Sequence, residues 1–339
     1  MSIFAVMTIR ENCSLAGRNT FGMDVKADRL IEFSSTEELK SILPGLERPV
    51  LMIGGGSNLL FTSDYRGTVL HSAITQIDVI GETEDCLHVR VGSGVIWDDF
   101  VAWCAVNGLW GVENLSAIPG EVGASAVQNI GAYGVEAKDV IDTVQTVCLD
   151  DCSERDFSHQ ECRYAYRQSV FKNELKGQYA VTYVIFILSK VPRPRLGYGA
   201  LEQEVERMGG PTLGNIRKAV IGIRESKLPD PKVLGNAGSF FMNPVITEQE
   251  FRVLRESYPN VPSYPAPGGN VKVPAGWLIE QAGWKGRSLG PAAVYERQAL
   301  VLVNTGGATG ADIIRLADTI IREVKEKFGI TLSTEVNYI

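Results

Sequence analysis

The sequence predicts an α+β protein made of two or three domains. Its 339 residues exceed the length at which a single hydrophobic core stops growing. Segments with helical and with strand periodicity follow one another irregularly, without the strict alternation of a doubly wound parallel sheet. Charged residues make up 22% and apolar residues 45% of the chain, as in ordinary globular proteins. Packed domains that mix helices and strands are therefore expected.

Start and stop signals delimit the elements of the first half of the chain. Ser35 followed by Glu38 predicts a capping box that opens a short helix reaching Leu43. Residues 97–106 read as a second helix, which Gly108 stops. Short apolar runs predict strands at 49–53, 59–61, 87–91 and 179–188.

The second half begins where proline and glycine become frequent. Beyond Arg224 they follow in close succession, which predicts a domain boundary near that residue. An amphipathic helix follows later and stops at Gly329; its apolar face carries Ile313, Leu316, Ala317, Ile320, Val324 and Phe328. A terminal strand is predicted to turn Ile330, Leu332, Val336 and Tyr338 inward and Ser333, Glu335 and Asn337 to the opposite face.

Composition argues against several classes of protein. The net charge is −7 and lysine and arginine do not cluster, which argues against nucleic-acid binding. The longest apolar stretch, 181–188, is too short to cross a membrane. The apolar run 3–7 has no basic leader, so no signal peptide is expected. Six cysteines without metal or redox spacing, with only three histidines, predict reduced thiols, no metal site and a cytoplasmic location.

Two glycine-containing turns compete as phosphate sites. Gly92-Ser93-Gly94 lies between a strand and a helix, where a dinucleotide fingerprint belongs. Trp97 occupies the third glycine position, and its bulk would block close packing of helix and strand. An ordinary strand-to-helix turn is favoured there over a Rossmann site.

The run Gly54-Gly55-Gly56-Ser57-Asn58 suits a phosphate better. Three glycines let several backbone N–H groups point into one concavity, and the next two side chains add donors. A second tract of small residues, 118–134, suggests a flat ligand pressed against backbone. A plain loop for the first tract, and tight packing of helix on sheet for the second, remain open.

Motifs spread over nearly the whole chain resemble, in order, those of the UDP-N-acetylenolpyruvoylglucosamine reductase family, in the subclass with an inserted tyrosine loop. The similar segments are Gly54 to Asn58, Glu113 to Gly120, Gln128 to Gly134, Tyr166-Arg167, Lys227 to Pro231, Gly235 to Phe241, Ala275 to Ile279, and Glu335.

The resemblance implies a fold and a reaction. The fold would be a two-subdomain FAD-binding fold of the vanillyl-alcohol-oxidase-like type (1–72 and 73–213) with a C-terminal α+β substrate-binding domain (214–339). Non-covalent FAD would take hydride from NADPH and pass it to the terminal alkene carbon of a UDP-sugar enolpyruvate, a step of peptidoglycan precursor synthesis. A monomer is favoured.

Three catalytic residues carry over from the resemblance. Arg167 would grip the substrate carboxylate, Glu335 would be neutral or hold Arg167 and substrate in register, and Ser239 would give a proton to carbon. By residue type alone, Arg167 equally suits a surface arginine, Glu335 an exposed strand-edge glutamate, and Ser239 a turn cap.

The resemblance also supplies binding residues. The cofactor-binding set is Gly54, Gly55, Gly56, Ser57, Asn58, Ile118, Pro119, Gly120, Gly123, Ala124, Ser125 and Asn129. The substrate-binding set is Tyr166, Tyr198, Lys227, Asn243, Tyr264, Lys285 and Gln298. Lys227 would face phosphates, and Tyr198, in a proline-flanked loop, would act as a mobile lid.

Three rival functions remain open at this stage. A flavin oxidase or hydroxy-acid dehydrogenase on the related fold would not need Ser239 and Glu335 together. A flavin-binding module without enzymatic activity would not need Arg167 either. The third rival, a Rossmann dehydrogenase, is weakened by Trp97.

Overall fold

The computed structural model describes residues 7–339, whose contacts divide the chain into two units. In the described part, the first unit contains residues 7–13, 27–55 and 65–224. The second unit contains residues 14–26, 56–64 and 225–339. The last division falls inside helix α5 (Leu213–Lys227).

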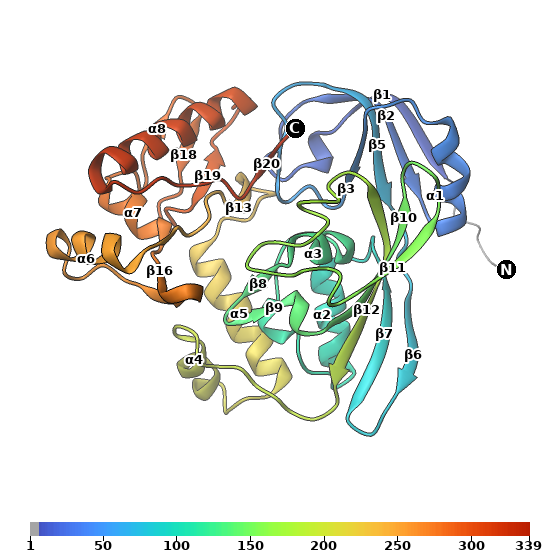
Figure 1. The fold of residues 1–339 in the computed structure, drawn as a ribbon, viewed down its shortest axis with the longest axis horizontal. Helices are drawn as coiled ribbons and strands as arrows, with labels where there is room; N and C mark the ends of the chain where they lie inside the picture. Colours follow the sequence, from blue (N-terminus) through green and yellow to red (C-terminus); the bar gives the residue numbers. More distant parts are fainter. Residues whose placement is uncertain (1–6) are drawn as a thin grey trace. The chain divides into compact units, whose positions relative to one another are not determined.

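The first unit begins with a four-stranded sheet in the order β1-β2-β5-β3 (Figure 1). Strands β2 and β3 both pair in parallel with β5. Helix α1 (Thr36–Ile42) follows β2, and its buried Leu39 belongs to a core that includes Phe33 and Leu70. The strands are β1 (Thr8–Ser14), β2 (Lys26–Phe33), β3 (Val50–Ile53) and β5 (Tyr65–Ser72).

A five-stranded antiparallel sheet in the order β11-β10-β12-β7-β6 forms the rest of the framework of this unit (Figure 1). Helix α3 (Val122–Gln128) packs on β7 and β12, and α2 (Trp97–Val106) packs beside it. The rings of Trp97, Phe100 and Phe186 meet in the core, with centroids 4.7–6.1 Å apart. The strands are β6 (Ile77–Glu82), β7 (Cys86–Gly92), β10 (Ile141–Cys148), β11 (Glu154–Ser158) and β12 (Tyr179–Ser189).

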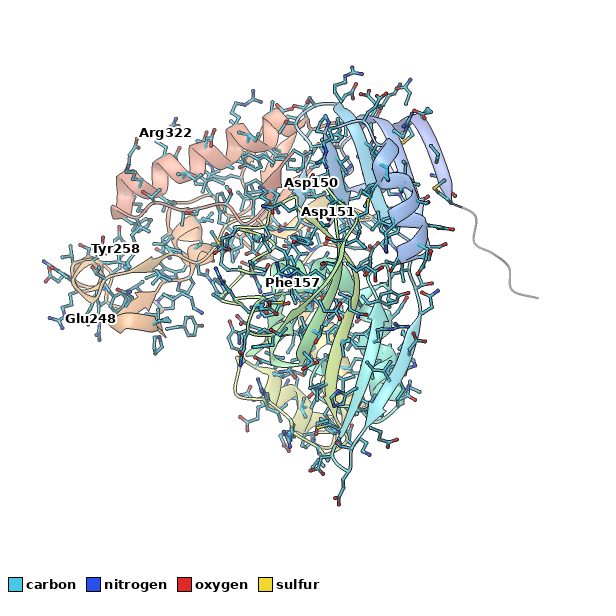
Figure 2. The ribbon with its side chains drawn as sticks, turned by 45° about the vertical axis from the view of Figure 1, so that its right-hand side comes forward. Asp150, Asp151, Phe157, Glu248, Tyr258 and Arg322 are labelled. Atoms are coloured by element: carbon cyan, nitrogen blue, oxygen red, sulfur yellow. The ribbon has the colours of Figure 1, made fainter. Side chains whose placement is uncertain are left out.

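Short elements complete the first unit. A two-stranded sheet joins β8 (Gly131–Ala132) to β9 (Val135–Glu136). Helix α4 (Leu201–Arg207) precedes α5, and buried side chains of both helices share one cluster with Trp110. On β11, the ring of Phe157 (Figure 2) lies 5.0 Å from that of Phe171.

The second unit contains a sheet in the order β13-β19-β18-β17, on which the long helix α8 (Gly310–Phe328) packs (Figure 1). The strands of this unit are β4 (Leu59–Leu60), β13 (Gly235–Ser239), β14 (Val245–Ile246), β15 (Tyr264–Ala266), β16 (Asn270–Lys272), β17 (Ser288–Leu289), β18 (Ala292–Val294), β19 (Val301–Asn304) and β20 (Asn337–Tyr338). Two smaller sheets pair β14-β16-β15 and β20-β4.

An aromatic cluster joins the helices of the second unit. Tyr258, which follows α6 (Glu248–Ser257; Figure 2), lies 5.7 Å from Trp277 of α7 (Ala275–Gln281) and 5.1 Å from Phe328 of α8. Single 3-10 turns occur at Ala16–Arg18, Leu43–Gly45, Glu113–Leu115, Ala137–Asp139 and Pro267–Gly269.

The predicted elements agree with the observed ones in most places. Helix α2 has the predicted bounds, and α8 ends at Gly329, whose φ of 72° is the left-handed cap conformation. Ser35 accepts a hydrogen bond from Glu38 N as expected, but the Glu38 carboxylate accepts from Ser34 N at 2.7 Å rather than from Ser35 N. The capping box is therefore only half formed.

The C-terminal segment also differs from the prediction. Ile330, Leu332 and Val336 are buried as predicted, but Tyr338 is 40% exposed. Only Asn337–Tyr338 forms a strand, because the segment pairs first with Phe241 through Thr334 and then with β4. The apolar run 3–7 lies, except for Met7, outside the described residues. Among the residues described, no helix has the length and apolar character needed to cross a membrane.

Candidate functional site

Gly54 and Gly55 of the first glycine-rich tract lie beside the second tract in the first unit. A Cβ added to Gly55 would be 3.3 Å from Gly120 Cα, and one added to Gly54 would be 3.2 Å from Ala124 Cβ. Gly55 is nevertheless exposed to solvent. Backbone of Gly55 and Gly120 thus meets at one accessible place, with a Glu121 carboxylate oxygen 3.2 Å from the Cβ position of Gly54. Exposed glycine backbone of this kind suits the close approach of a phosphate-bearing, flat cofactor.

Gly56 and Asn58 make close backbone contacts and hydrogen bonds within the second unit. A Cβ on Gly56 would lie 2.0 Å from Arg18 O, and the φ of +64° at this position favours glycine. Asn58 Nδ2 donates to Glu335 O at 3.3 Å, and Asn58 O accepts from Asn337 N at 3.1 Å. The end of the first glycine tract therefore fastens the C-terminal segment.

Several small residues of the second tract pack tightly. A Cβ on Gly123 would be 2.7 Å from Ser93 Cβ. Ser125 Oγ donates to Val122 O at 2.7 Å. Asn129, fully buried with a left-handed φ of 47°, donates through Nδ2 to Ala165 O at 2.8 Å. These contacts within α3 and to the neighbouring loops hold the tract in shape. Ile118 packs against the same core.

Arg167 lies against the segment that follows α3. Its Nη2 donates to Gly131 O at 2.8 Å, and its own φ is +57°, a strained value for arginine. The Tyr166 ring is 37% exposed, with the Arg167 guanidinium carbon 5.5 Å from its centroid. The guanidinium is thus positioned by backbone rather than free on a flexible stem.

Arg224 is a second half-buried cation in this part of the first unit, and no motif in the sequence pointed to it. Its Nε donates to Ala117 O at 3.2 Å. Burial lowers the pKa of Arg224, the nearby Tyr133 and Asp98 raise it, and the like charge of Arg167 lowers it further. An arginine on a helix reads as a solvated residue, so periodicity could not reveal this burial.

The backbone segments that carry Ser239 and Glu335 pair with each other in the second unit. Ser239 ends β13, and the next residue, Phe240, accepts at its backbone oxygen a hydrogen bond of 2.8 Å from Glu335 N. A bridge between Phe241 and Thr334 continues this antiparallel contact. The backbone segments that carry Ser239 and Glu335, far apart in sequence, therefore lie next to each other.

The predicted substrate-binding residues divide by exposure. Tyr198 is 48% and Tyr264 46% exposed, and Lys227 is exposed at the end of α5. Of the remaining residues, Asn243 Oδ1 accepts from Ala275 N at 2.9 Å, Lys285 pairs with Glu280 at 2.9 Å, and Gln298 Oε1 accepts from Leu300 N at 3.3 Å. Lys285 is exposed like the first three, whereas Asn243 and Gln298 are half-buried.

Cysteines and metal ligands add nothing to this site. All six cysteines are free. Within residues 7–339, no group of three or more His, Cys, Asp or Glu side chains is arranged to hold a metal ion.

Comparison with known proteins identifies the class first. Residues 27–152 match the family described as "FAD binding domain". A solved structure titled "Crystal Structure of UDP-N-Acetylenolpyruvylglucosamine Reductase (MurB) from Thermus caldophilus" superposes with a TM-score of 0.69 over 98% of this chain and 99% of that one, at 24% identity. The protein is thus a flavoprotein whose predicted α+β fold, an FAD-binding part followed by a C-terminal domain, is confirmed.

Sequence relatives then give the family. Residues 230–339 match the family described as "UDP-N-acetylenolpyruvoylglucosamine reductase, C-terminal domain". Proteins named UDP-N-acetylenolpyruvoylglucosamine reductase are 52% identical in Bacteroides fragilis (strain YCH46) and 49% identical in Porphyromonas gingivalis (strain ATCC 33277), each match covering 98% of this chain and all of the relative. The chain belongs to the UDP-N-acetylenolpyruvoylglucosamine reductase family, as its motifs predicted, and is an FAD-dependent oxidoreductase.

Proposed function

We propose that this enzyme uses NADPH to reduce UDP-N-acetylglucosamine enolpyruvate to UDP-N-acetylmuramate, with non-covalent FAD, in the cytoplasm as a monomer. The observation that supports this most directly is the backbone pairing that brings the Ser239 segment beside Glu335. A flavin oxidase or a flavin-binding module without enzymatic activity would not need both a proton donor and a carboxylate on these two adjacent segments. We also retain the domain division 1–72, 73–213 and 214–339 as part of the proposal.

The cofactor would be held by the backbone of Gly54, Gly55 and Gly120, with Ser57 and Pro119 beside them. The argument is the surface of bare backbone that a side chain at Gly55 would fill. When bound, FAD supplies the hydride chemistry, taking hydride from NADPH and giving it to the alkene terminus. The chain's own residues then have to control charge and protons.

Arg167 would stabilise the charge that develops on the substrate. Hydride addition leaves negative charge on the neighbouring carbon, which spreads into the attached carboxylate. A guanidinium fixed by Gly131 O can bind that carboxylate with two parallel hydrogen bonds. Glu335 would contribute in its neutral form or by keeping Arg167 and the substrate in register, because an ionised carboxylate would repel the substrate's own.

Ser239 would complete the reaction by giving a proton to carbon. A serine hydroxyl is a weak acid, so it can act only on a strongly basic carbon. Lys227 would bind the phosphates of NADPH and then of the UDP-sugar, while Tyr198 and Tyr264 cover the substrate. Tyr166, Asn243, Lys285 and Gln298 would also bind the substrate.

An absorption experiment tests the proposal. The purified protein should be yellow, NADPH should bleach it, and the enolpyruvyl UDP-sugar should restore the colour with formation of UDP-N-acetylmuramate. Restoration by oxygen alone, with no effect of the sugar, would indicate an oxidase. A yellow protein that NADPH does not bleach would indicate a binding module and sink the proposed function.

A further inference from the structure

A buried asparagine in the first unit joins two backbone segments. Asn114, on the 3-10 turn Glu113–Leu115, is 1% exposed. Its Nδ2 donates to Tyr133 O at 2.8 Å and to Arg195 O at 2.7 Å. An amide nitrogen has two protons, so both are used. A flipped amide would set an oxygen against two carbonyl oxygens, so the chemistry fixes its orientation.

One of these segments is the loop between β12 and α4, which carries Tyr198. Arg195 fastens this loop to the rest of the unit at two points: its carbonyl accepts from Asn114, and its guanidinium pairs with Asp139 at 2.6 Å. The amide contact is buried, whereas the Arg195 side chain is 57% exposed. Of the two, the buried contact is the one expected to restrain the loop.

The other segment supports the ring of Tyr198. Tyr133, whose φ is +49°, meets Tyr198 edge to face with centroids 6.1 Å apart. Asn114 therefore holds both the loop that carries Tyr198 and the residue against which its ring rests.

We propose that Asn114 is a positioning residue that fixes Tyr198 for substrate binding, and that it acts through the Arg195 carbonyl. This rests on the proposed function, in which Tyr198 covers the UDP-sugar. Asn114 itself touches no substrate in this scheme. Its loss should let the loop leave its place, so that Tyr198 contributes less to binding.

Trypsin provides a direct test of the anchor. Within this loop, Arg193 is followed by Pro194 and resists trypsin, and Lys190–Val191 and Arg195–Leu196 are the bonds that trypsin can cut. Only Arg195–Leu196 has a scissile carbonyl that Asn114 holds, so cleavage is counted at that bond by the masses of the fragments. Asn114→Leu should speed cleavage at this bond by about tenfold or more, because the opening of a segment follows the loss of its buried hydrogen bonds. The matched control is Asp139→Asn, which weakens the ion pair of the same arginine, and with it the Asp139 contacts to Lys138 and Glu136 N, but leaves the Asn114 bond intact. It should change the rate by less than about threefold.

Steady-state kinetics test the consequence. Asn114→Leu should raise the KM for the enolpyruvyl UDP-sugar by about fivefold or more, with FAD content and bleaching by NADPH within twofold of the parent. In Tyr198→Ala the same Asn114 substitution should add almost nothing, because residues that act through one another are not additive. A residue needed only for folding would instead lower FAD content and kcat, with KM unchanged.

Several outcomes overturn the inference. Unchanged cleavage at Arg195–Leu196, multiplicative KM effects in the double variant, or unchanged KM would each do so. Asn114→Asp, which keeps the shape and removes the donors, serves as the second variant, and if neither variant folds Asn114 is a core residue and the inference is wrong. A parent enzyme inactive on the sugar would reject the proposed function instead, and the protease experiment would still test the anchor.

Discussion

The backbone of Gly120 lies close to the position that a Cβ atom on Gly55 would occupy. The 3.3 Å separation between an added Cβ and Gly120 Cα is tighter than most Cβ contacts, and neither atom can rotate away. The sequence presents three equal glycines at 54–56, but their surroundings differ: Gly55 faces the second tract and solvent, whereas Gly56 is packed on Arg18 O. Pattern alone predicted a phosphate nest for all three.

Gly55→Val should therefore cost most of the bound FAD. The branched side chain would both separate the two tracts and occupy the surface where phosphate oxygens approach. The measurement is the ratio of flavin to protein absorbance after purification, which should fall by about tenfold. Gly45→Val is the matched control, since nothing lies within 4 Å of its Cβ position, and it should keep its flavin. Equal flavin in both variants would remove the first tract from the cofactor site.

Ser239→Ala gives the sharpest test of a catalytic role. Bleaching by NADPH should stay near the parent rate, because no proton to carbon is needed there. The return of colour on mixing the bleached enzyme with the UDP-sugar should slow by roughly 10²- to 10⁴-fold, the usual worth of a general acid. Ser239→Cys, which keeps a donor, should recover part of the rate. If Ser239→Ala recovers colour at the parent rate, water or another side chain supplies the proton.

At the level of elements, an ion pair joins α2 to α5. Asp98 accepts from both terminal nitrogens of Arg217, at 2.6 and 2.7 Å, and from Ala117 N at 2.6 Å. Ala117 has a positive φ of 57° and precedes the Ile118-Pro119-Gly120 segment, so this carboxylate braces the second glycine tract. Partial burial alone would raise the pKa of Asp98, but the hydrogen bonds from Arg217 and Ala117 outweigh it, and the net pKa is lowered.

The lowered pKa sets the sign of a pH effect. Folding favours the ionised form, so this stabilisation is present above the ordinary carboxyl value of 3.8 and is lost as the pH falls through the lower folded value. Asp98→Asn should reduce the free energy of unfolding by about 1–3 kcal/mol at neutral pH, with a smaller difference in acid. Urea melts at pH 7 and near pH 3 measure this. The exposed Asp99→Asn on the same helix is the control, and a pH-independent loss would reject the ion-pair explanation.

The Tyr198 loop is an element that sequence identified correctly as irregular. No helix or strand lies between β12 and α4, as the prolines and glycines predicted. Its anchor could not be foreseen, because Asn114 and Arg195 are 81 positions apart. Propensity reveals local turns, whereas a side-chain bond between distant segments depends on the assembled fold.

Tyr198→Phe should act on the sugar and not on NADPH oxidation. Removal of the hydroxyl deletes a polar contact with the substrate while the ring can still rest on Tyr133. The KM for the UDP-sugar should rise by several-fold, and the rate of bleaching by NADPH should change by less than about twofold. Tyr164→Phe, a tyrosine outside the predicted binding set, is the comparison. An equal loss in both half-reactions would assign Tyr198 to the fold instead of a lid.

For the whole molecule, the assignment of chain segments to the two units was the least predictable property. The second unit takes residues 14–26 and 56–64 in addition to 225–339. Contacts of Phe21 show why residues 14–26 belong to the second unit. A Cβ on Gly235 would lie 2.3 Å from Phe21 O, and Asn304 Nδ2 donates a hydrogen bond to the same oxygen at 3.1 Å. Neither short segment differs in composition from its neighbours. Composition and turn signals therefore predict a boundary near Arg224 but do not predict that residues 14–26 and 56–64 join the second unit.

FAD should stabilise the folded protein without being covalently attached to it. Neither glycine tract contains a histidine or cysteine to tether a flavin. His71, in the same unit, has its ring nitrogens 3.1 and 2.9 Å from the carboxylates of Glu32 and Glu121, so both nitrogens already have protein partners. Acid precipitation should leave the flavin in the supernatant, and flavin retained in the pellet would contradict this.

The flavin-free protein should melt several degrees below the complete one. A ligand that binds only the folded state stabilises it by about 2.7 kcal/mol at a free concentration of 100 times its Kd. Returning FAD at increasing concentration should raise the Tm progressively, whereas riboflavin, which lacks the diphosphate, should raise it far less if the glycine tracts bind phosphate oxygens. Equal stabilisation by riboflavin and FAD would mean that the bare backbone at Gly55 and Gly120 contributes packing but no phosphate binding, and would move the diphosphate site elsewhere in the chain.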